Sequence, residues 1–238
     1  MNRTFKSNLC LLGTALIWGF ALVAQRDSMS VMGPFMYNAI RMFLGSAALV
    51  PVFIISDRIK GRSSEADKAL EQTKAAGSTL LKGGIIAGVV IFLSMNLQQV
   101  ALVSTDAGKT AFITALYIIL VPLGAVLLGH KIKRSNWLGA LLALAGLYLL
   151  SIHGAVTLNF GDGLVLISAL FWTVQILFID RFAGLVDVIE LSVAQIFVCW
   201  LGSSICALLF EDIAWAPILA AWFAIFYGGV MSGGVAFT

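Results

Sequence analysis

Long apolar runs separated by short polar connections form the dominant pattern of this 238-residue chain. About 20 helical residues, at 1.5 Å each, cross a hydrocarbon core of roughly 30 Å. Runs long enough to do so occur at about 8–25, 34–56, 83–104, 110–129, 136–152, 163–179, 188–210 and 216–238. In lipid only helices or closed barrels satisfy the backbone, and these runs show no alternation. The pattern therefore predicts an all-α polytopic membrane protein with eight transmembrane helices.

The composition supports a lipid environment. Hydrophobic residues make up 60% of the chain and charged residues 11%, and the mean hydropathy is +0.99. A soluble domain is nearer half apolar and a quarter charged, so too little polar sequence remains to cover a soluble core. The net charge is +3. Because the basic residues stand between apolar runs rather than in a patch, we expect the lipid bilayer, and not nucleic acid, as a partner.

The chain shows no signature of a cofactor or of catalysis. Its cysteines and histidines lack the spacing of a metal site, and no P-loop is present, so we expect neither a metal nor direct use of ATP. The segment "VMSGG" around Ser232 lacks the first glycine of a nucleophile elbow. His130 and His153 have no evident catalytic partner. A membrane-embedded enzyme remains only as an alternative.

The basic residues predict the orientation of the chain. If the helices alternate in direction, most lysines and arginines fall on one side, together with the polar segment 57–82. The other side receives only Arg26 and Lys109, besides the acidic pair at 211–212. By the positive-inside rule the N-terminus and the loop 57–82, part of which could form a surface helix, are cytoplasmic. We expect a multi-pass protein of the plasma (inner) membrane.

An internal repeat accompanies this pattern. A shift of 154 residues, which becomes 141 beyond the polar loop, aligns the two parts of the chain. It pairs Trp18 with Trp172, Arg41 with Gln195, Phe43 with Phe197 and Gly88 with Gly229. The first helix of one copy runs outward and that of the other inward, so the copies have opposite topology. Inverted repeats are typical of secondary transporters, whose binding site lies where the copies meet.

Several segments resemble one known family. They are "LIWGFALVAQR", "IRMFLG", "STDAGKTAFITALYIILVPLGAVLLG", "NWLGALLALAGLYLLS" and "GDGLVLISALFWTVQILFIDRFA". They look like an EamA-type carrier of the drug/metabolite transporter superfamily. The resemblance implies ten helices in two inverted five-helix repeats, a central cavity, and movement of small metabolites, amino acids or drugs, often as efflux. Residues 1–152 would form the first EamA repeat.

Residues 160–238 would then form an incomplete second repeat. The chain ends inside the eighth predicted helix, so helices nine and ten are absent, and we expect a fragment of a longer protein. The function expected for the whole carrier is secondary transport of small amino-acid-like or amphipathic solutes by alternating access. A non-transporting membrane protein or an inactive fragment is the alternative. Whether the protein is a monomer or a homodimer stays open.

Polar side chains within the apolar runs are the candidate site, because such groups are costly in lipid and usually face a cavity or another helix. The candidate substrate-binding residues are Trp18, Gln25, Asn96, Gln99, Thr114, Tyr117, Trp172 and Gln175. Their amide, hydroxyl and indole groups suit a neutral or zwitterionic solute. The alternative is that they form hydrogen bonds between helices.

Two cations are possible contacts for an anionic solute. Arg41 lies seven residues after Pro34, about 10 Å along the predicted helix. It could bind an anion, or its side chain could extend to the outer surface. Lys109 stands in a first helical turn, where the helix dipole disfavours a cation. Asp106, just before it, can cap that helix.

The predicted span at 110–129 contains Pro122, which removes an N–H group and crowds the carbonyl one turn earlier. We therefore expect this helix to bend or open there. Thr110, Thr114 and Tyr117 are three or four residues apart and form one polar stripe. By the family resemblance, the inverted partner of this span is the absent ninth helix. The stripe is thus expected to face a cavity that is open where that helix belongs.

Overall fold

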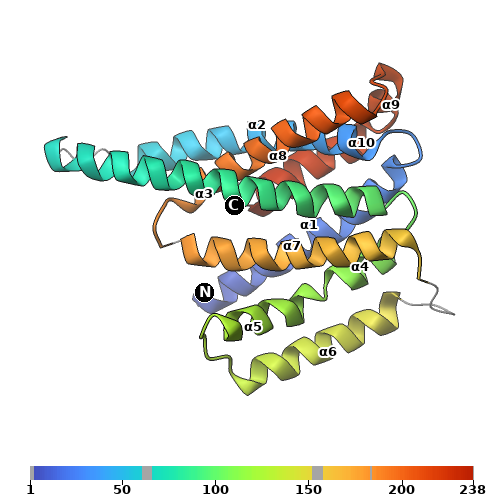
Figure 1. Ribbon diagram of the computed structural model, residues 1–238, viewed down its shortest axis with the longest axis horizontal. Helices are drawn as coiled ribbons and strands as arrows, with labels where there is room; N and C mark the ends of the chain where they lie inside the picture. The colour runs from blue at the N-terminus through green and yellow to red at the C-terminus, as the bar shows by residue number, and fades with distance from the viewer. Residues whose placement is uncertain (1–2, 61–65, 152–157, 183, 238) are drawn as a thin grey trace.

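A computed structural model describes residues 3–60, 66–151, 158–182 and 184–237 (Figure 1). Within these residues the regular structure is helical, with no β-strand, so the predicted all-α class is confirmed. The helices are α1 (Arg3–Ser28), α2 (Pro34–Lys60), α3 (Ala66–Ala101), α4 (Ala107–Thr114), α5 (Tyr117–Leu127), α6 (Arg134–Ser151), α7 (Phe160–Phe182), α8 (Val188–Phe210), α9 (Trp215–Ala220), α10 (Trp222–Phe226), the π-helix η1 (Tyr227–Gly234) and the 3-10 helix η2 (Val235–Phe237).

Five helical segments of the described chain are long and apolar enough to cross a membrane. They are Ser7–Ser28, Gly77–Ala101, Ala107–Leu127, Phe160–Phe182 and Val188–Phe210. The other three predicted spans correspond to α2, α6 and the run from α9 to η2, which are helical as well. Eight membrane crossings remain a prediction.

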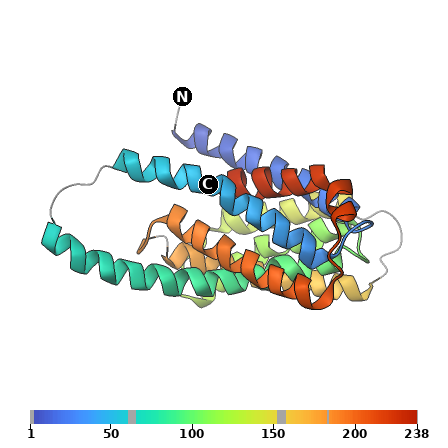
Figure 2. The same cartoon turned by 90° about the horizontal axis from the view of Figure 1, so that it is seen from above.

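The polar segment at 57–82, which the sequence predicted to be mainly a loop, is mostly helical in the structure. α2 continues to Lys60 and α3 begins at Ala66, so most of the segment is helical. Residues 61–65 lie outside the described residues. The start of α3, "ADKALEQTKAAG", consists mainly of strong helix formers. Figure 2 shows α2 and α3 extending from the rest of the bundle at this end.

The long helices lie side by side in one bundle, and successive membrane-length segments run in opposite directions, with α4 and α5 together forming one such segment (Figure 1). α3 packs against α7 and α8, and α2 packs against α8 and η1. On the other side of α7 lie α4 and α5, and α6 forms the edge next to them. The connections 29–33, 102–106 and 211–214 share one end of the bundle, which we call the Glu211 end. The basic connection 128–133 lies at the opposite end.

Small residues let the central helices approach closely. A Cβ atom added to Gly88 of α3 would overlap Val198 of α8. A Cβ atom on Gly229 of η1 would lie 2.7 Å from Cβ of Leu44 in α2. Contact between helix backbones of this kind is typical of membrane bundles, where lipid removes the hydrophobic drive between helices. The chain thus positions its polar side chains between tightly packed helices.

The predicted span at 110–129 is interrupted at Ala115 and Leu116, between α4 and α5. There the amide of Ile118 donates to the carbonyl of Ala115 (2.9 Å) and that of Ile119 to Leu116 (3.0 Å), three residues back instead of four. Pro122 lies inside α5. The interruption therefore precedes the turn that the proline was expected to open.

Candidate functional site

Asn96 connects three helices. Its Nδ2 atom donates to Ser203 Oγ of α8 (2.8 Å) and to the carbonyl of Phe92 (2.9 Å). Its Oδ1 atom accepts from Asn38 Nδ2 of α2 (3.1 Å), which also donates to the carbonyl of Met95 (3.2 Å). The three polar side chains are buried. Asn96 therefore lies where α2, α3 and α8 cross.

Gln99, one turn further along α3, contacts α1. Its Nε2 atom lies 3.3 Å from Sδ of Met29 and 3.5 Å from the carbonyl oxygen of Gln25. Its Oε1 atom has no hydrogen-bond partner among the described residues. Gln25 is buried too. The structure thus brings together two of the predicted site residues, Gln25 and Gln99.

The polar stripe of α4 and α5, formed by Thr110, Thr114 and Tyr117, contacts α3 through Thr114. Gln98 Nε2 donates to Thr114 Oγ1 (2.7 Å). Thr110 is fully buried, and its Oγ1 atom has no described partner. Tyr117 is half-buried at the start of α5. Because Thr110 is enclosed by protein, the expectation that the stripe faces an open cavity is wrong at this residue.

Gln175 and Trp172 lie on α7, inside the bundle. Gln175 Nε2 donates to Oε1 of Gln195 in α8, and both side chains are buried. Trp172 packs against the buried cluster that includes Met42 and Met95. Its Nε1 atom has no partner in the described part of the chain. These residues extend the buried polar region from α2 and α3 to α7 and α8.

Trp18 lies apart from that region. It is partly exposed on α1, and its Nε1 atom donates to the carbonyl of Ser232 in η1 (3.4 Å). The hydroxyl of Tyr227 donates to the carbonyl of Ile17 (3.3 Å). Trp18 therefore belongs to the contact between α1 and η1.

Arg41 stays inside the bundle. Its side chain is 3% exposed. The guanidinium carbon lies 5.5 Å from the centroid of the Tyr37 ring, and Nη2 lies 3.6 Å from Sδ of Met95. The side chain contacts the ring of Tyr37, which precedes it by one helical turn on the side of the Glu211 end, and it remains buried. In this structure it does not extend to the surface.

Lys109 has a partner that the sequence did not predict. Its Nζ atom lies 2.6 Å from Asp162 Oδ2 of α7. That carboxylate also accepts from the amide of Asn159 (2.7 Å) and, through Oδ1, from Thr105 Oγ1 (3.3 Å). Lys109 is thus neither simply solvated nor an unbalanced charge. Asp106 occupies the N-cap position of α4 as expected, but its side chain makes no capping hydrogen bond.

Glu211 is a second polar contact that sequence reasoning missed. Its Oε1 and Oε2 atoms accept from the backbone amides of Phe35 and Met36, each at 2.8 Å. The carboxylate therefore caps the N-terminus of α2 from the segment after α8. Capping residues are sought just before a helix, and 176 residues separate Glu211 from Phe35, so local sequence gave no signal.

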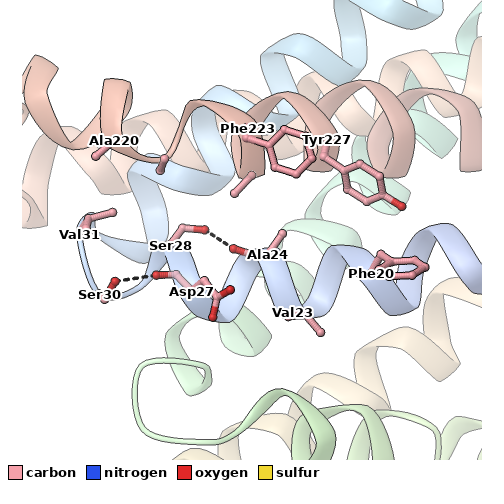
Figure 3. A pocket seen from close by; sticks show the side chains of 12 residues that line it. Phe20, Val23, Ala24, Asp27, Ser28, Ser30, Val31, Ala220, Phe223 and Tyr227 are labelled. Carbon is pink, nitrogen blue, oxygen red and sulfur yellow. Dashed lines mark hydrogen bonds between the residues drawn. The ribbon is translucent and has the colours of Figure 1, made fainter.

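A cavity of about 820 Å³ opens between α1 and the segment from α9 to η1 (Figure 3). Phe20, Phe223 and Tyr227 form aromatic walls, and Asp27 and Ser30 are among its polar residues. None of the eight predicted substrate-binding residues lines it. In the part of the chain that the structure describes, no group of three His, Cys, Asp or Glu side chains could hold a metal ion.

With this geometry in view, the chain can be placed among known proteins. The family described as the EamA-like transporter family matches residues 5–152, more than half of the chain. The chain belongs to the EamA-like transporter family. Within this EamA protein the matched region runs from α1 through α6. The resemblance to the drug/metabolite transporter superfamily is thereby confirmed.

Two relatives are named as uncharacterized transporters. One, from Archaeoglobus fulgidus, is 29% identical over 199 residues, which cover 83% of this EamA chain and 56% of the relative. The other, YoaV of Bacillus subtilis, is 23% identical over 242 residues, covering 98% of this chain and 77% of the relative. The chain therefore spans little more than half the length of the archaeal relative.

A solved structure shares the fold. It is titled "Crystal structure of protein" and matches 96% of this chain and 75% of its own, with a TM-score of 0.70 and 21% sequence identity. At this level of identity the likeness concerns the fold alone.

Proposed function

We propose that this EamA chain forms the solute pathway of a secondary transporter for small organic solutes, amino-acid-like or amphipathic, that works by alternating access. The single observation that carries this proposal is the buried polar region where α2, α3, α7 and α8 meet. Polar atoms without described partners include Trp172 Nε1 and Gln175 Oε1 in this region, and Gln99 Oε1 where α3 lies against α1. Buried polar groups are normally paired, so such atoms are available to a solute.

Equivalent contacts in the two halves support the inverted repeat. The sequence repeat pairs Gly88 with Gly229 and Leu44 with Val198. Gly88 packs against Val198, and Gly229 packs against Leu44. The same relation holds for whole helices, because α3 packs on α8 as η1 packs on α2. Two copies related in this way are the architecture on which rocking about a central site depends.

Two polar contacts between the halves support a gate at the Glu211 end. Lys109 of α4 pairs with Asp162 of α7, and Glu211 caps α2. Both contacts join a helix of the first predicted repeat to the second. Alternating access requires one end of the pathway to be closed while the other opens, and these contacts would hold this end closed. The orientation that we propose is a cytoplasmic N-terminus in the plasma (inner) membrane, which places the Glu211 end outside.

Uptake into reconstituted vesicles tests the proposed function. The purified chain is offered a panel of labelled amino acids, their neutral analogues and amphipathic amines. We expect saturable uptake of at least one solute, lowered at least about tenfold by Asn96→Ala or Gln175→Ala, because each removes a hydrogen-bonding group from the polar region. The control is Asn136→Ala, which removes an exposed amide of α6.

Two outcomes separate the alternatives. If wild-type protein gives no saturable uptake across the panel, the chain is a non-transporting membrane protein. If uptake is present and unchanged in the Asn96 and Gln175 variants, these residues only hold helices together, and the pathway lies elsewhere.

A further inference from the structure

Arg41 carries a charge that the surrounding protein does not balance. It is the one buried cation among the residues whose burial the structure describes. Its Nε atom has no hydrogen-bond partner, and no described carboxylate forms an ion pair with it. Its contacts, the Tyr37 ring and the sulfur of Met95, are weak substitutes for a counter-charge. A charge inside a membrane span is costly and is a functional-site candidate by default.

Helix packing does not account for this charge. The position paired with Arg41 in the sequence repeat holds Gln195 on α8. Gln195 is a neutral side chain that is hydrogen-bonded to Gln175. A neutral amide therefore fits the corresponding place in α8, and packing between the helices does not by itself require a guanidinium.

A donor from the other half packs on the same buried cluster that Arg41 contacts through Met95. Trp172 of α7 packs on the cluster that contains Met95, and its Nε1 atom is unpartnered like Nε of Arg41. The guanidinium with its unpartnered Nε–H group, together with the unpartnered indole N–H of Trp172, matches the needs of an oxyanion, which accepts several hydrogen bonds.

We propose that Arg41 binds the carboxylate of the transported solute, and that the solute class is small organic acids and amino acids carrying one carboxylate. This inference rests on the proposed transport function. One guanidinium balances one negative charge, and the described part of the bundle interior holds no second cation. A monoanionic carboxylate therefore fits better than a phosphate dianion, and a guanidinium binds a carboxylate through two parallel hydrogen bonds.

Access to Arg41 depends on η1. A Cβ atom on Gly228 of this π-helix would lie 3.0 Å from Cδ of Arg41 and 2.6 Å from the hydroxyl oxygen of Tyr37. The Tyr37 hydroxyl donates to the carbonyl of Ala224 (3.0 Å), a residue that lines the 820 Å³ cavity. The continuous segment from α10 to η1 therefore contacts Arg41 at Gly228 and lines the cavity with Ala224 and Tyr227. π-helical segments are frequent at functional sites, and displacement of this one would open the arginine to the cavity.

Ligand-dependent thermal stability of the purified chain in detergent tests the proposal. The probes are N-acetylated aliphatic and aromatic amino acids, each matched with its neutral amide, and inorganic phosphate. We expect at least one carboxylate to raise the melting temperature while its amide and phosphate do not. Arg41→Gln should weaken that carboxylate at least about tenfold, and Arg26→Gln, which removes a less buried cation, should not. Binding of amides as strong as of acids, preference for phosphate, carboxylate binding retained by Arg41→Gln, or no carboxylate binding at all would overturn the proposal.

Two further variants separate a ligand-binding arginine from a structural one. Without ligand, Arg41→Met should raise the melting temperature, because an unbalanced buried charge is replaced by an apolar side chain of similar length. A structural arginine predicts a fall. Arg41→Lys keeps the charge and should still bind the carboxylate, more weakly than the wild type. This residual binding would show that the loss of binding in Arg41→Gln is not caused by misfolding.

The transport proposal can fail separately from this one. Saturable uptake of amides but not acids would overturn the carboxylate site and leave transport standing. Carboxylate binding that depends on Arg41, without uptake into vesicles, would overturn transport and leave the site standing.

Discussion

The ammonium group of Lys109 lies 2.6 Å from the carboxylate of Asp162, which joins the start of α4 to the start of α7. The Lys109 side chain is 19% exposed and that of Asp162 3%, so the pair sits at the rim of the bundle with its negative partner enclosed. A partly enclosed pair is screened less than a surface pair. It can therefore both stabilise the closed arrangement and resist its opening.

Replacing Asp162 tests how much this pair contributes. Asp162→Asn keeps the size of the side chain but removes the negative charge that lies against Lys109 Nζ. We expect the free energy of unfolding to fall by about 1–3 kcal/mol, less than for a fully buried pair because Lys109 keeps some solvation. Thermal or denaturant unfolding in detergent measures it. Asp106→Asn, at an exposed carboxylate without a capping bond, is the control and should change little. Equal effects of the two variants would contradict the assignment.

Replacing Glu211 tests the cap of α2. Glu211→Gln loses one of the two acceptor oxygens for the amides of α2, and we expect a cost of about 1 kcal/mol. A Cβ atom on Gly33 would overlap the same carboxylate, so Gly33→Ala should displace Glu211 and cost a similar amount. Both changes disrupt the same contact, so their effects should not add. The double variant should be within about 0.5 kcal/mol of the less stable single variant. Asp212→Asn, at an exposed neighbour, is the control.

Additive losses in the Gly33 and Glu211 variants would mean that the two residues act independently. The cap would then not be the reason why glycine stands at position 33.

Alanine at the paired glycines tests the packing of the two halves. Gly88→Ala meets the flexible side chain of Val198, whereas Gly229→Ala meets both Leu44 and the backbone carbonyl of Arg41 at 2.9 Å. Each should destabilise the chain by about 1–3 kcal/mol through overpacking. Val198→Ala should restore most of the loss at Gly88. Leu44→Ala should restore only part of the loss at Gly229, because a backbone carbonyl cannot be shortened.

Gly146→Ala is the matched control for both glycines. It lies in the interior of α6, and a Cβ atom there meets nothing within 4 Å. The change should be neutral or stabilising by up to about 1 kcal/mol, since alanine favours helix. A loss at Gly146 as large as at Gly88 would show that backbone propensity, rather than contact between the halves, determines the result.

The fold class could be predicted from the sequence because only helices and closed barrels satisfy backbone hydrogen bonds in lipid. The starts of individual helices could also be predicted where a local signal exists, as at Pro34, the first residue of α2. The segment 57–82 was expected as a loop because its charges break the apolar pattern. Charge does not oppose helix, however, and Ala, Glu, Lys and Gln there favour it. Polarity was therefore a poor guide to where α2 and α3 end.

Only part of the candidate site could be predicted from the sequence. Asn96, Gln99 and Gln175 were chosen because amides are costly in lipid, and each is indeed buried between helices. Their partners could not be predicted, since Ser203, Met29 and Gln195 come from distant parts of the chain. For the same reason Lys109 was expected to stand alone: its partner is 53 residues away, in the first turn of α7.

The most direct test of alternating access is to lock the contact at the Glu211 end. Lys109→Cys and Asp162→Cys are combined in a background with serine at the exposed Cys10 and the half-buried Cys206. The cysteines are then bridged by a short thiol cross-linker that a reductant cleaves, and solute uptake into vesicles is measured. We predict that cross-linking abolishes saturable uptake and that reduction restores it, while the cross-linker does not change the uptake by either single-cysteine variant. Uptake that continues at the same rate with the bridge in place would contradict alternating access between these two halves.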